Sequence, residues 1–349
     1  MAEMTTFDFG PHSLGELEGA DRSTRDAVGT VEFPAGCWLQ LSEGASGHLA
    51  NLVDLPSGSI EYVGADGVEL TPTDFAAIAA VPGCTRFDFD NTSFDDEAAA
   101  GFANLPITTL SLGGTNISDA GLSALSSVAT LEFLFVSRTA VSDRGLATLR
   151  AHQALAFLAC ARTDVTPASA EVIATWPRLT ELQFHEATDA VVVAAARPRT
   201  TSLHLSRATL TRRGISALDE CVELESLGLP LSDLDIGACT ALGELSSLRY
   251  LMLRNAAVDT FALAGALEHL NELRGLDLFG TGIGDECVAA LLACNFLESL
   301  DVSETRVTDD GVAELRWLPR LTHFEAENAA VSASAIAALP HLPKPFELG

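Results

Sequence analysis

The chain has 349 residues, 48% of them apolar, and a formal net charge of −28. This apolar content can supply a continuous core, but no run approaches the roughly 18 apolar residues that span a bilayer. The negative charge argues against nucleic acid and anionic membranes as partners, because like charges repel.

The charge is distributed unevenly. Residues 1–130 hold 19 acidic and 3 basic residues, residues 131–213 hold 7 acidic residues and 10 arginines, and residues 214–349 hold 22 acidic and 7 basic residues. Two acidic ends around an arginine-bearing middle favour a basic partner. A general solubility strategy, as in a salt-adapted organism, explains the same charge equally well.

The segment 1–56 does not follow the pattern of the rest of the chain. Met1 to about Gly29 is polar and acidic, and we expect it to be partly disordered. The segment from Val31 to Leu41 reads as two short strands around a Pro-Ala-Gly turn. Because a stack of repeats needs its first apolar layer covered, residues 1–56 are predicted to include an N-terminal cap.

One phrase recurs from residue 57 to about residue 340, with an apolar core, a threonine turn and a short apolar helix. Its central apolar residues are Phe87, Leu110, Leu134, Leu158, Leu182, Leu203, Leu227, Leu251, Leu276, Leu300 and Phe324. The regular spacing of these centres is the signature of a repeat architecture, and a degenerate earlier copy is predicted at Ile60. The step from Leu182 to Leu203 is shorter than the others, which either shapes a site or reflects drift.

The residues within one copy indicate a strand followed by a helix. Leu134 and Val136 alternate with Phe133 and Phe135, which predicts a short strand with the leucine side facing the core. Asp143 is predicted to cap the N-terminus of the next helix, because its carboxylate can accept from free backbone amides. The equivalent aspartates are Asp119, Asp285 and Asp309.

A threonine motif identifies the repeat class. It reads Thr115-Asn116-Ile117-Ser118-Asp119-Ala120-Gly121-Leu122, and it recurs at 139–146, at 305–312 and, with Cys287 in place of glycine, at 281–288. The motif resembles the bacterial ribonuclease-inhibitor-like class of the leucine-rich-repeat superfamily. Threonine stands where many such repeats have asparagine. We therefore expect the turn backbone to be satisfied by Thr115, Thr139, Thr163, Thr281 and Thr305.

The resemblance implies an α/β fold in the form of a leucine-rich-repeat solenoid. Parallel strands would lie on the concave face of a curved horseshoe, and short helices would lie on the convex face. About 11 or 12 repeats would fill residues 57–340. Residues 341–349 would form a C-terminal tail.

The seven cysteines indicate the redox state of the compartment in which the protein is found. Their number is odd and their spacing matches no metal site, so we expect buried free thiols and a reducing cytoplasm. The N-terminus also lacks the basic-then-apolar form of a secretory signal.

Catalytic motifs are missing from the sequence, which has no phosphate-binding glycine loop and no His-Glu-x-x-His or Gly-x-Ser-x-Gly pattern. Glu181, His185 and His204 could converge on neighbouring strands as an acid–base or metal trio. Contacts to a partner are the favoured interpretation of these residues. We therefore predict no enzyme activity, no cofactor and no metal.

Outward strand positions are where repeat proteins of this shape usually bind. Phe133, Phe135 and Phe157 are predicted to form an exposed aromatic patch, with Arg138 and Arg162 in a row beside it. The full set of predicted partner-binding residues is Phe133, Phe135, Phe157, Arg138, Arg162, His185, His204, Tyr250, Met252, Arg254 and Phe279. A slipped strand register, or packing against the cap or an inserted loop, would remove the patch.

A separate acidic stripe is predicted from Asp277, Asp301, Glu325 and Glu327. Such a row could hold a cation, but a solvated face or a basic partner is favoured.

The function expected from these features is a cytoplasmic, monomeric interaction module. It would bind a protein or peptide, in one version a basic one, on its concave face and act as a scaffold, inhibitor or recognition subunit. Similarity to the acidic ribonuclease inhibitor makes inhibition of a basic enzyme a specific version. The alternative is a secreted, host-directed bacterial effector or adaptor whose repeats select a target.

Overall fold

The structure is a computed structural model and describes residues 4–340 and 342. The chain divides into two compact parts, Met1–Arg178 and Leu179–Gly349, which we call the N-terminal unit and the C-terminal unit. The predicted tail, residues 341–349, lies outside the described residues apart from Leu342. The predicted boundary between cap and repeats at residue 56 stays a prediction.

The N-terminal unit begins with short antiparallel strands. They are β1 (Met4–Asp8), which pairs with β4 (Thr30–Pro34), and β2 (Gly15–Glu18), which pairs with β3 (Thr24–Asp26) and β5 (Cys37–Leu41). Phe7, Leu14 and Leu17 are buried here. The expected partial disorder of the segment 1–29 is therefore wrong for residues 4–29, because apolar side chains among the acidic ones make a small core.

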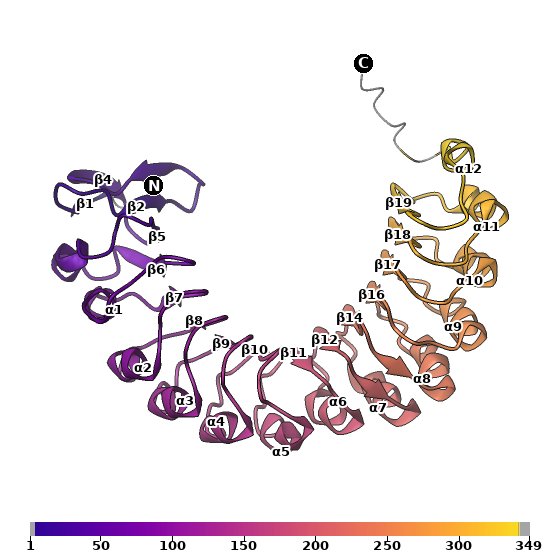
Figure 1. Ribbon diagram of the computed structural model, residues 1–349, viewed down its shortest axis with the longest axis horizontal. Coiled ribbons are helices and arrows are strands. Elements are labelled where there is room, and N and C mark those ends of the chain that lie inside the picture. The colour runs from indigo at the N-terminus through magenta and orange to yellow at the C-terminus, as the bar shows by residue number, and fades with distance from the viewer. Residues whose placement is uncertain (1–3, 341, 343–349) are drawn as a thin grey trace. The chain divides into compact units, whose positions relative to one another are not determined.

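Repeating strand–helix pairs fill the rest of this unit. A 3₁₀ helix (Leu49–Asp54) precedes β6 (Ile60–Gly64), β7 (Arg86–Asp88), β8 (Thr109–Ser111), β9 (Phe133–Phe135) and β10 (Phe157–Ala159), which pair in parallel in that order after β5. The helices are α1 (Pro72–Ala79), α2 (Asp96–Phe102), α3 (Asp119–Leu125), α4 (Asp143–Thr148), a 3₁₀ turn (Pro167–Ser169) and α5 (Ala170–Ile173). Figure 1 shows these helices on one side of the unit and the strands on the other.

The C-terminal unit has the same construction. Its parallel strands are β11 (Glu181–His185), β12 (Ser202–Ser206), β14 (Ser226–Gly228), β16 (Tyr250–Met252), β17 (Gly275–Asp277), β18 (Ser299–Asp301) and β19 (His323–Glu325). Its helices are α6 (Asp189–Ala195), α7 (Arg212–Ser216), α8 (Ile236–Ala241), α9 (Thr260–Leu267), α10 (Asp285–Ala290), α11 (Asp309–Glu314) and α12 (Ala333–Ala337), and several of the helices are followed by a 3₁₀ turn (Ala217–Glu220, Leu242–Glu244, Leu291–Ala293 and Leu315–Trp317). The short strands β13 (Thr209–Leu210) and β15 (Asp233–Leu234) pair with each other.

The strand register confirms the predicted core positions. Leu134 pairs with Leu110 and Leu158 and is fully buried, so the register is not slipped. Leu182 pairs with Leu203, so the shortened step lies between β11 and β12 and leaves their pairing intact. Within each unit the expected α/β solenoid, with parallel strands on one face and helices on the other, is confirmed.

The earliest repeat is centred differently from the prediction. Val63, not Ile60, pairs with Phe87, and Leu39 pairs in turn with Val63. These two steps have the same length as the step from Leu110 to Leu134, so the phase of the repeats extends back to β5.

Two further predictions about buried polar groups are confirmed. The hydroxyl of each motif threonine donates to the carbonyl of a residue just before it in the turn, as from Thr115 to Leu112 and from Thr139 to Val136, both at 2.6 Å. Thr163, Thr281 and Thr305 do the same. All seven cysteines lie in the described part of the chain, where they are buried and form no disulfide.

The prediction that the motif aspartates cap their own helices is wrong. Ser118, Ser142 and Thr308 are the N-caps, and Asp119, Asp143 and Asp309 begin the helices. Each carboxylate instead accepts from the cap residue of the following repeat. Asp119 accepts from the backbone N–H and the hydroxyl of Ser142, both at 2.7 Å. Asp143 bonds Thr166, Asp285 bonds Thr308 and Asp309 bonds Ser332 in the same way.

The glycine of the motif makes room for this bond. A Cβ at Gly145 would lie 2.5 Å from the Asp119 carboxylate, and Gly121 stands in the same relation to Asp96. Cys287 can replace the glycine because the preceding helix begins with Thr260 in place of aspartate, and the Cys287 thiol bonds the Thr260 carbonyl. The Ser/Thr-Asp-x-Gly motif thus encodes a hydrogen bond between successive repeats, which we call the repeat ladder.

The repeat ladder gives a double-mutant prediction. Asp119→Ala removes two hydrogen bonds to a charged group and should lower the free energy of unfolding by about 2 kcal/mol. Gly145→Ala should destabilise the wild type by steric overlap. In the Asp119→Ala background Gly145→Ala should cost less, because the overlap with the carboxylate is gone and alanine favours the helix, and only the 3.1 Å approach to the backbone Cα of residue 119 remains. Urea denaturation of the four proteins measures the coupling, and additive effects would contradict the ladder.

A buried histidine gives a pH prediction. His152 is buried, and within the described part of the chain neither ring nitrogen has a hydrogen-bond partner. Burial lowers the pKa of His152 below its usual 6.5, against the opposing effect of nearby carbonyls. The unfolded chain therefore takes up a proton first as the pH falls below about 6.5, and the free energy of unfolding declines.

The variant His152→Leu should weaken this decline by up to about 1.4 kcal/mol per pH unit. Thermal or urea unfolding between pH 8 and pH 5 measures it, with the exposed His269→Leu as the control. An identical pH dependence in the wild type and in His152→Leu would contradict the assignment.

Candidate partner-binding surfaces

The outward strand residues of the N-terminal unit form two rows. From β5 to β10 the first row is Trp38, Tyr62, Arg86, Thr109, Phe133 and Phe157, and the second is Gln40, Gly64, Asp88, Ser111, Phe135 and Ala159. Most positions in the first row are aromatic. The strand face therefore presents an aromatic row, which extends beyond the predicted phenylalanine patch.

The predicted phenylalanine patch is present on this face but is less exposed than expected. Phe133 is 37% exposed, whereas Phe135 is half-buried and Phe157 is only 8% exposed. The Phe157 ring centroid lies 4.5 Å from that of Phe135 and 6.4 Å from that of Phe133. Aromatic side chains on adjacent strands bury one another. Phe157 thus packs against Phe133 and Phe135 and is itself buried, so the prediction of three exposed rings is wrong.

The two arginines predicted beside this patch lie in turns. Arg138 and Arg162 have φ values of +60° and +57°, in the left-handed region, directly after the strand segment. Both side chains are exposed, and an Arg138 guanidinium N–H donates to Asn91 Oδ1 at 3.1 Å. They border the strand face rather than forming a row on the sheet.

Sequence reasoning missed Trp38 and Tyr62. Their ring centroids are 5.5 Å apart, and the Arg86 guanidinium lies 5.6 Å from the Trp38 ring centroid. The Tyr62 hydroxyl donates to Asp88 at 3.2 Å. Burial, together with the charges of Asp90 and Asp66, raises the pKa of Asp88. The regular step back from Phe87 to Val63 was the signal that could have found these residues.

The C-terminal unit carries the equivalent rows on its own strands. The first is Glu181, Ser202, Ser226, Tyr250, Gly275, Ser299 and His323, and the second is Gln183, His204, Gly228, Met252, Asp277, Asp301 and Glu325. Small residues dominate around Tyr250 and Met252.

The two predicted histidines lie on this face but in different settings. His185 Nδ1 is 2.8 Å from the Ser206 hydroxyl, whereas His204 pairs with Gln183 and not with Glu181 or His185. Burial lowers the pKa of His204. Among residues 4–340 and 342, no three His, Cys, Asp or Glu side chains are grouped closely enough to hold a metal. The Glu181–His185–His204 trio is therefore not assembled.

A hollow of about 390 Å³ opens on the strand face around Tyr250 and Met252. These side chains are 51% and 37% exposed. Gly228 and Gly275 flank them. A Cβ at Gly228 would lie 2.5 Å from His204 Nδ1, and one at Gly275 would lie 2.9 Å from the Tyr250 ring. We call this feature the Tyr250 hollow. The absence of a side chain at Gly228 and Gly275 leaves space for the rings of His204 and Tyr250.

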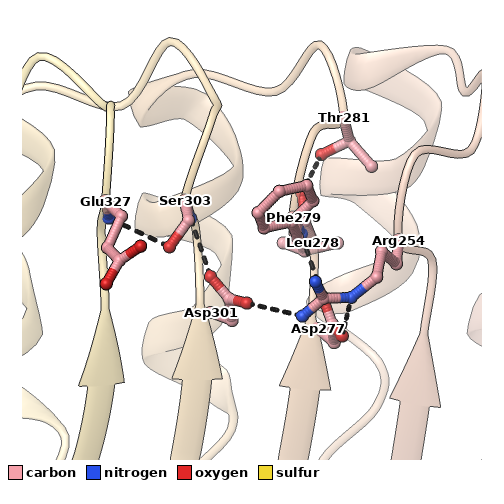
Figure 2. A network of polar contacts seen from close by, with 8 residues as sticks. All are labelled: Arg254, Asp277, Leu278, Phe279, Thr281, Asp301, Ser303 and Glu327. Carbon is pink, nitrogen blue, oxygen red and sulfur yellow. Dashed lines mark hydrogen bonds and ion pairs between the residues drawn. The ribbon is translucent and has the colours of Figure 1, made fainter.

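One wall of the Tyr250 hollow is a polar network (Figure 2). Arg254 donates to Asp277 at 2.9 Å and to Asp301 at 3.0 Å, and its guanidinium stacks 4.3 Å from the Phe279 ring centroid. Arg254 and Phe279 are therefore engaged with each other and with two aspartates of the predicted acidic stripe.

The remaining carboxylates of the stripe differ from these aspartates. Asp301 also accepts from the backbone N–H of Ser303, whose hydroxyl accepts from the Glu327 N–H. The side chains of Glu325 and Glu327 are exposed on and just after β19. Arg254 thus neutralises the part of the stripe on β17 and β18, and the remaining negative charge lies at Glu325 and Glu327, on and just after β19.

Comparison with known proteins agrees with this fold. A family model described as Leucine Rich repeat matches residues 103–126 and 293–315, one segment in each unit. No curated protein matches the chain in sequence. Within the described residues, no helix combines the length and apolar character needed to traverse a bilayer.

Solved structures share the architecture at low identity. An internalin (inlF) from Listeria monocytogenes is 18% identical, with 82% of this chain and 86% of that chain covered and a TM-score of 0.55. The ectodomain of the Arabidopsis thaliana receptor kinase GASSHO1/SCHENGEN3 is 15% identical, with coverage of 87% and 39% and a TM-score of 0.54. The mouse RP105/MD-1 complex is 16% identical, with coverage of 87% and 53% and a TM-score of 0.53.

At these identities the likeness concerns the fold, and the chain spans only about two-fifths to half of the latter two proteins. The fold, the repeat motif and the two matched segments agree with one another. The chain therefore has the leucine-rich-repeat fold, with one segment in each unit that matches the Leucine Rich repeat family model.

Proposed function

We propose that the chain is an interaction module that binds a protein or peptide on its strand faces. The leucine-rich-repeat fold is generally a protein-interaction module. Two of the similar structures contain a partner, CASPARIAN STRIP INTEGRITY FACTOR 2 in one and MD-1 in the other. Binding at the strand face supports roles as a scaffold, inhibitor or recognition subunit.

The observation that carries the proposal is the set of large apolar side chains exposed on the strands. On the strands that pair in parallel, they are Trp38 and Phe133 in the N-terminal unit and Tyr250 and Met252 in the C-terminal unit. These side chains lie outside the core, and the part of their apolar surface that faces solvent is free to contact a partner. Exposed aromatic side chains beside charged groups are typical of binding hot spots.

The partner is proposed to be basic and the compartment reducing. The net charge of −28 favours a positively charged partner and speeds its association. The seven buried thiols suit the cytoplasm, where cysteines stay reduced. Binding rather than catalysis is supported by the unassembled Glu181–His185–His204 trio.

Capture from native lysate tests the proposal. Four baits are compared by quantitative mass spectrometry: the wild type, Trp38→Ala/Phe133→Ala, Tyr250→Ala/Met252→Ala and the control Trp317→Ala. Trp317 is a large exposed side chain outside the strands. We expect a protein held by the wild type and by the control, and reduced roughly tenfold or more with at least one double variant. Equal capture by all four baits would contradict strand-face binding.

A further inference from the structure

We propose that the Tyr250 hollow binds an extended peptide segment in which an apolar side chain and a lysine or arginine lie about three or four residues apart. This inference rests on the proposed function and names the partner chemistry for one surface. Its support is the shape of the hollow, its apolar floor and the charge of one wall.

The shape of the hollow comes from the small residues around two large ones. Tyr250 and Met252 stand on β16, with Ser226 and Gly228 on one neighbouring strand and Gly275 on the other. A volume of about 390 Å³ holds several side chains of a peptide rather than a single small group. Because the open space crosses successive parallel strands, a bound segment can run across them in an extended conformation.

The exposed side chains of Tyr250 and Met252 indicate where an apolar residue of the peptide binds. Tyr250 and Met252 each leave a third or more of their surface to solvent while their neighbour Leu251 is buried in the core. A partner's aliphatic or aromatic side chain can cover both, and methionine adapts its shape to different occupants. The two exposed side chains therefore fix where the apolar residue of the peptide lies.

The carboxylates on one wall of the hollow indicate where a basic residue of the peptide binds. Asp277, Asp301 and Glu325 occupy paired positions on β17, β18 and β19, and all three line the hollow. Arg254 is the only arginine or lysine among the residues that line the hollow, and it bonds the first two. Three carboxylates against one guanidinium leave a negative excess, and Glu325 is exposed at the far end. An incoming lysine or arginine can therefore pair with Glu325, beside Asp301, whose carboxylate already bonds Arg254.

The separation of the two contacts sets the spacing in the peptide. Neighbouring strands are about 4.8 Å apart, so the distance from β16 to β18 or β19 is roughly 10–14 Å. An extended chain rises about 3.3 Å per residue, so this distance corresponds to about three or four residues. The Arg254 network, braced by Phe279, fixes the nearer carboxylates before the peptide arrives.

Selection from a peptide library tests the inference on the full chain. The probe is a phage-displayed library of random linear peptides of about twelve residues, roughly 40 Å when extended. Selected peptides are synthesised and titrated by fluorescence anisotropy. We expect sequences with an aromatic or aliphatic residue about three or four positions from lysine or arginine. Acid-rich sequences, or no enriched sequence, would overturn the inference.

Matched variants locate the bound peptide. Tyr250→Ala/Met252→Ala should weaken binding roughly tenfold or more. Asp301→Asn/Glu325→Gln should weaken it about fivefold and reduce its salt dependence, whereas the exposed pair Glu268→Gln/Glu272→Gln should not. Glu325→Gln alone, which leaves the Arg254 network intact, should weaken binding by about twofold or more. Melting temperatures establish that each variant is folded.

Two outcomes separate this inference from the proposed function. If the selected peptides are insensitive to the hollow variants but are lost with Trp38→Ala/Phe133→Ala, the inference fails and strand-face binding stands. If they are insensitive to every strand-face variant, the inference also fails. The lysate experiment then decides the proposed function on its own, because it does not depend on these peptides.

Discussion

The constraint on which the structure depends is that one repeat is completed by the next. A single repeat exposes the side of its strand and the start of its helix, and both are satisfied by a neighbour. On the helix side, the Asp119 carboxylate bonds the backbone and hydroxyl of Ser142, and Gly145 leaves the space for it. On the strand side, the central leucines pair in register and are buried. Together these contacts fix how each repeat is placed on the one before it.

This constraint frees the outward strand positions for other uses. Leu251 and its equivalents form the core, and residues one position before and after them face outward. The chain places Tyr250 and Met252 there in one unit and Trp38 and Phe133 in the other. Small residues stand beside them, such as Gly228 and Gly275, where a Cβ would meet His204 and Tyr250. Large residues with small neighbours in the same row shape the Tyr250 hollow.

Local patterns in the sequence predicted the features that depend on interactions within one repeat. The alternation around Leu134 predicted the strand and its inward side, and the threonine motif predicted the turn hydrogen bonds. The roles that failed depend on residues one repeat away. The prediction that Asp119 caps its own helix fails because its partner, Ser142, belongs to the next repeat. The prediction that Phe157 is exposed fails because the ring that covers it, Phe135, lies on another strand. The Arg254 pairs with Asp277 and Asp301 escaped prediction for the same reason.

The central claim is that the strand faces bind the partner while the repeat ladder and the core hold the stack. Hydrogen exchange of the full chain, with and without the captured partner, tests it most directly. The account predicts slower exchange in the strands and the turns that follow them, for example around residues 250–255 and 299–304, with helix α9 unchanged. Protection confined to the helices, with the strands unaffected, would contradict it.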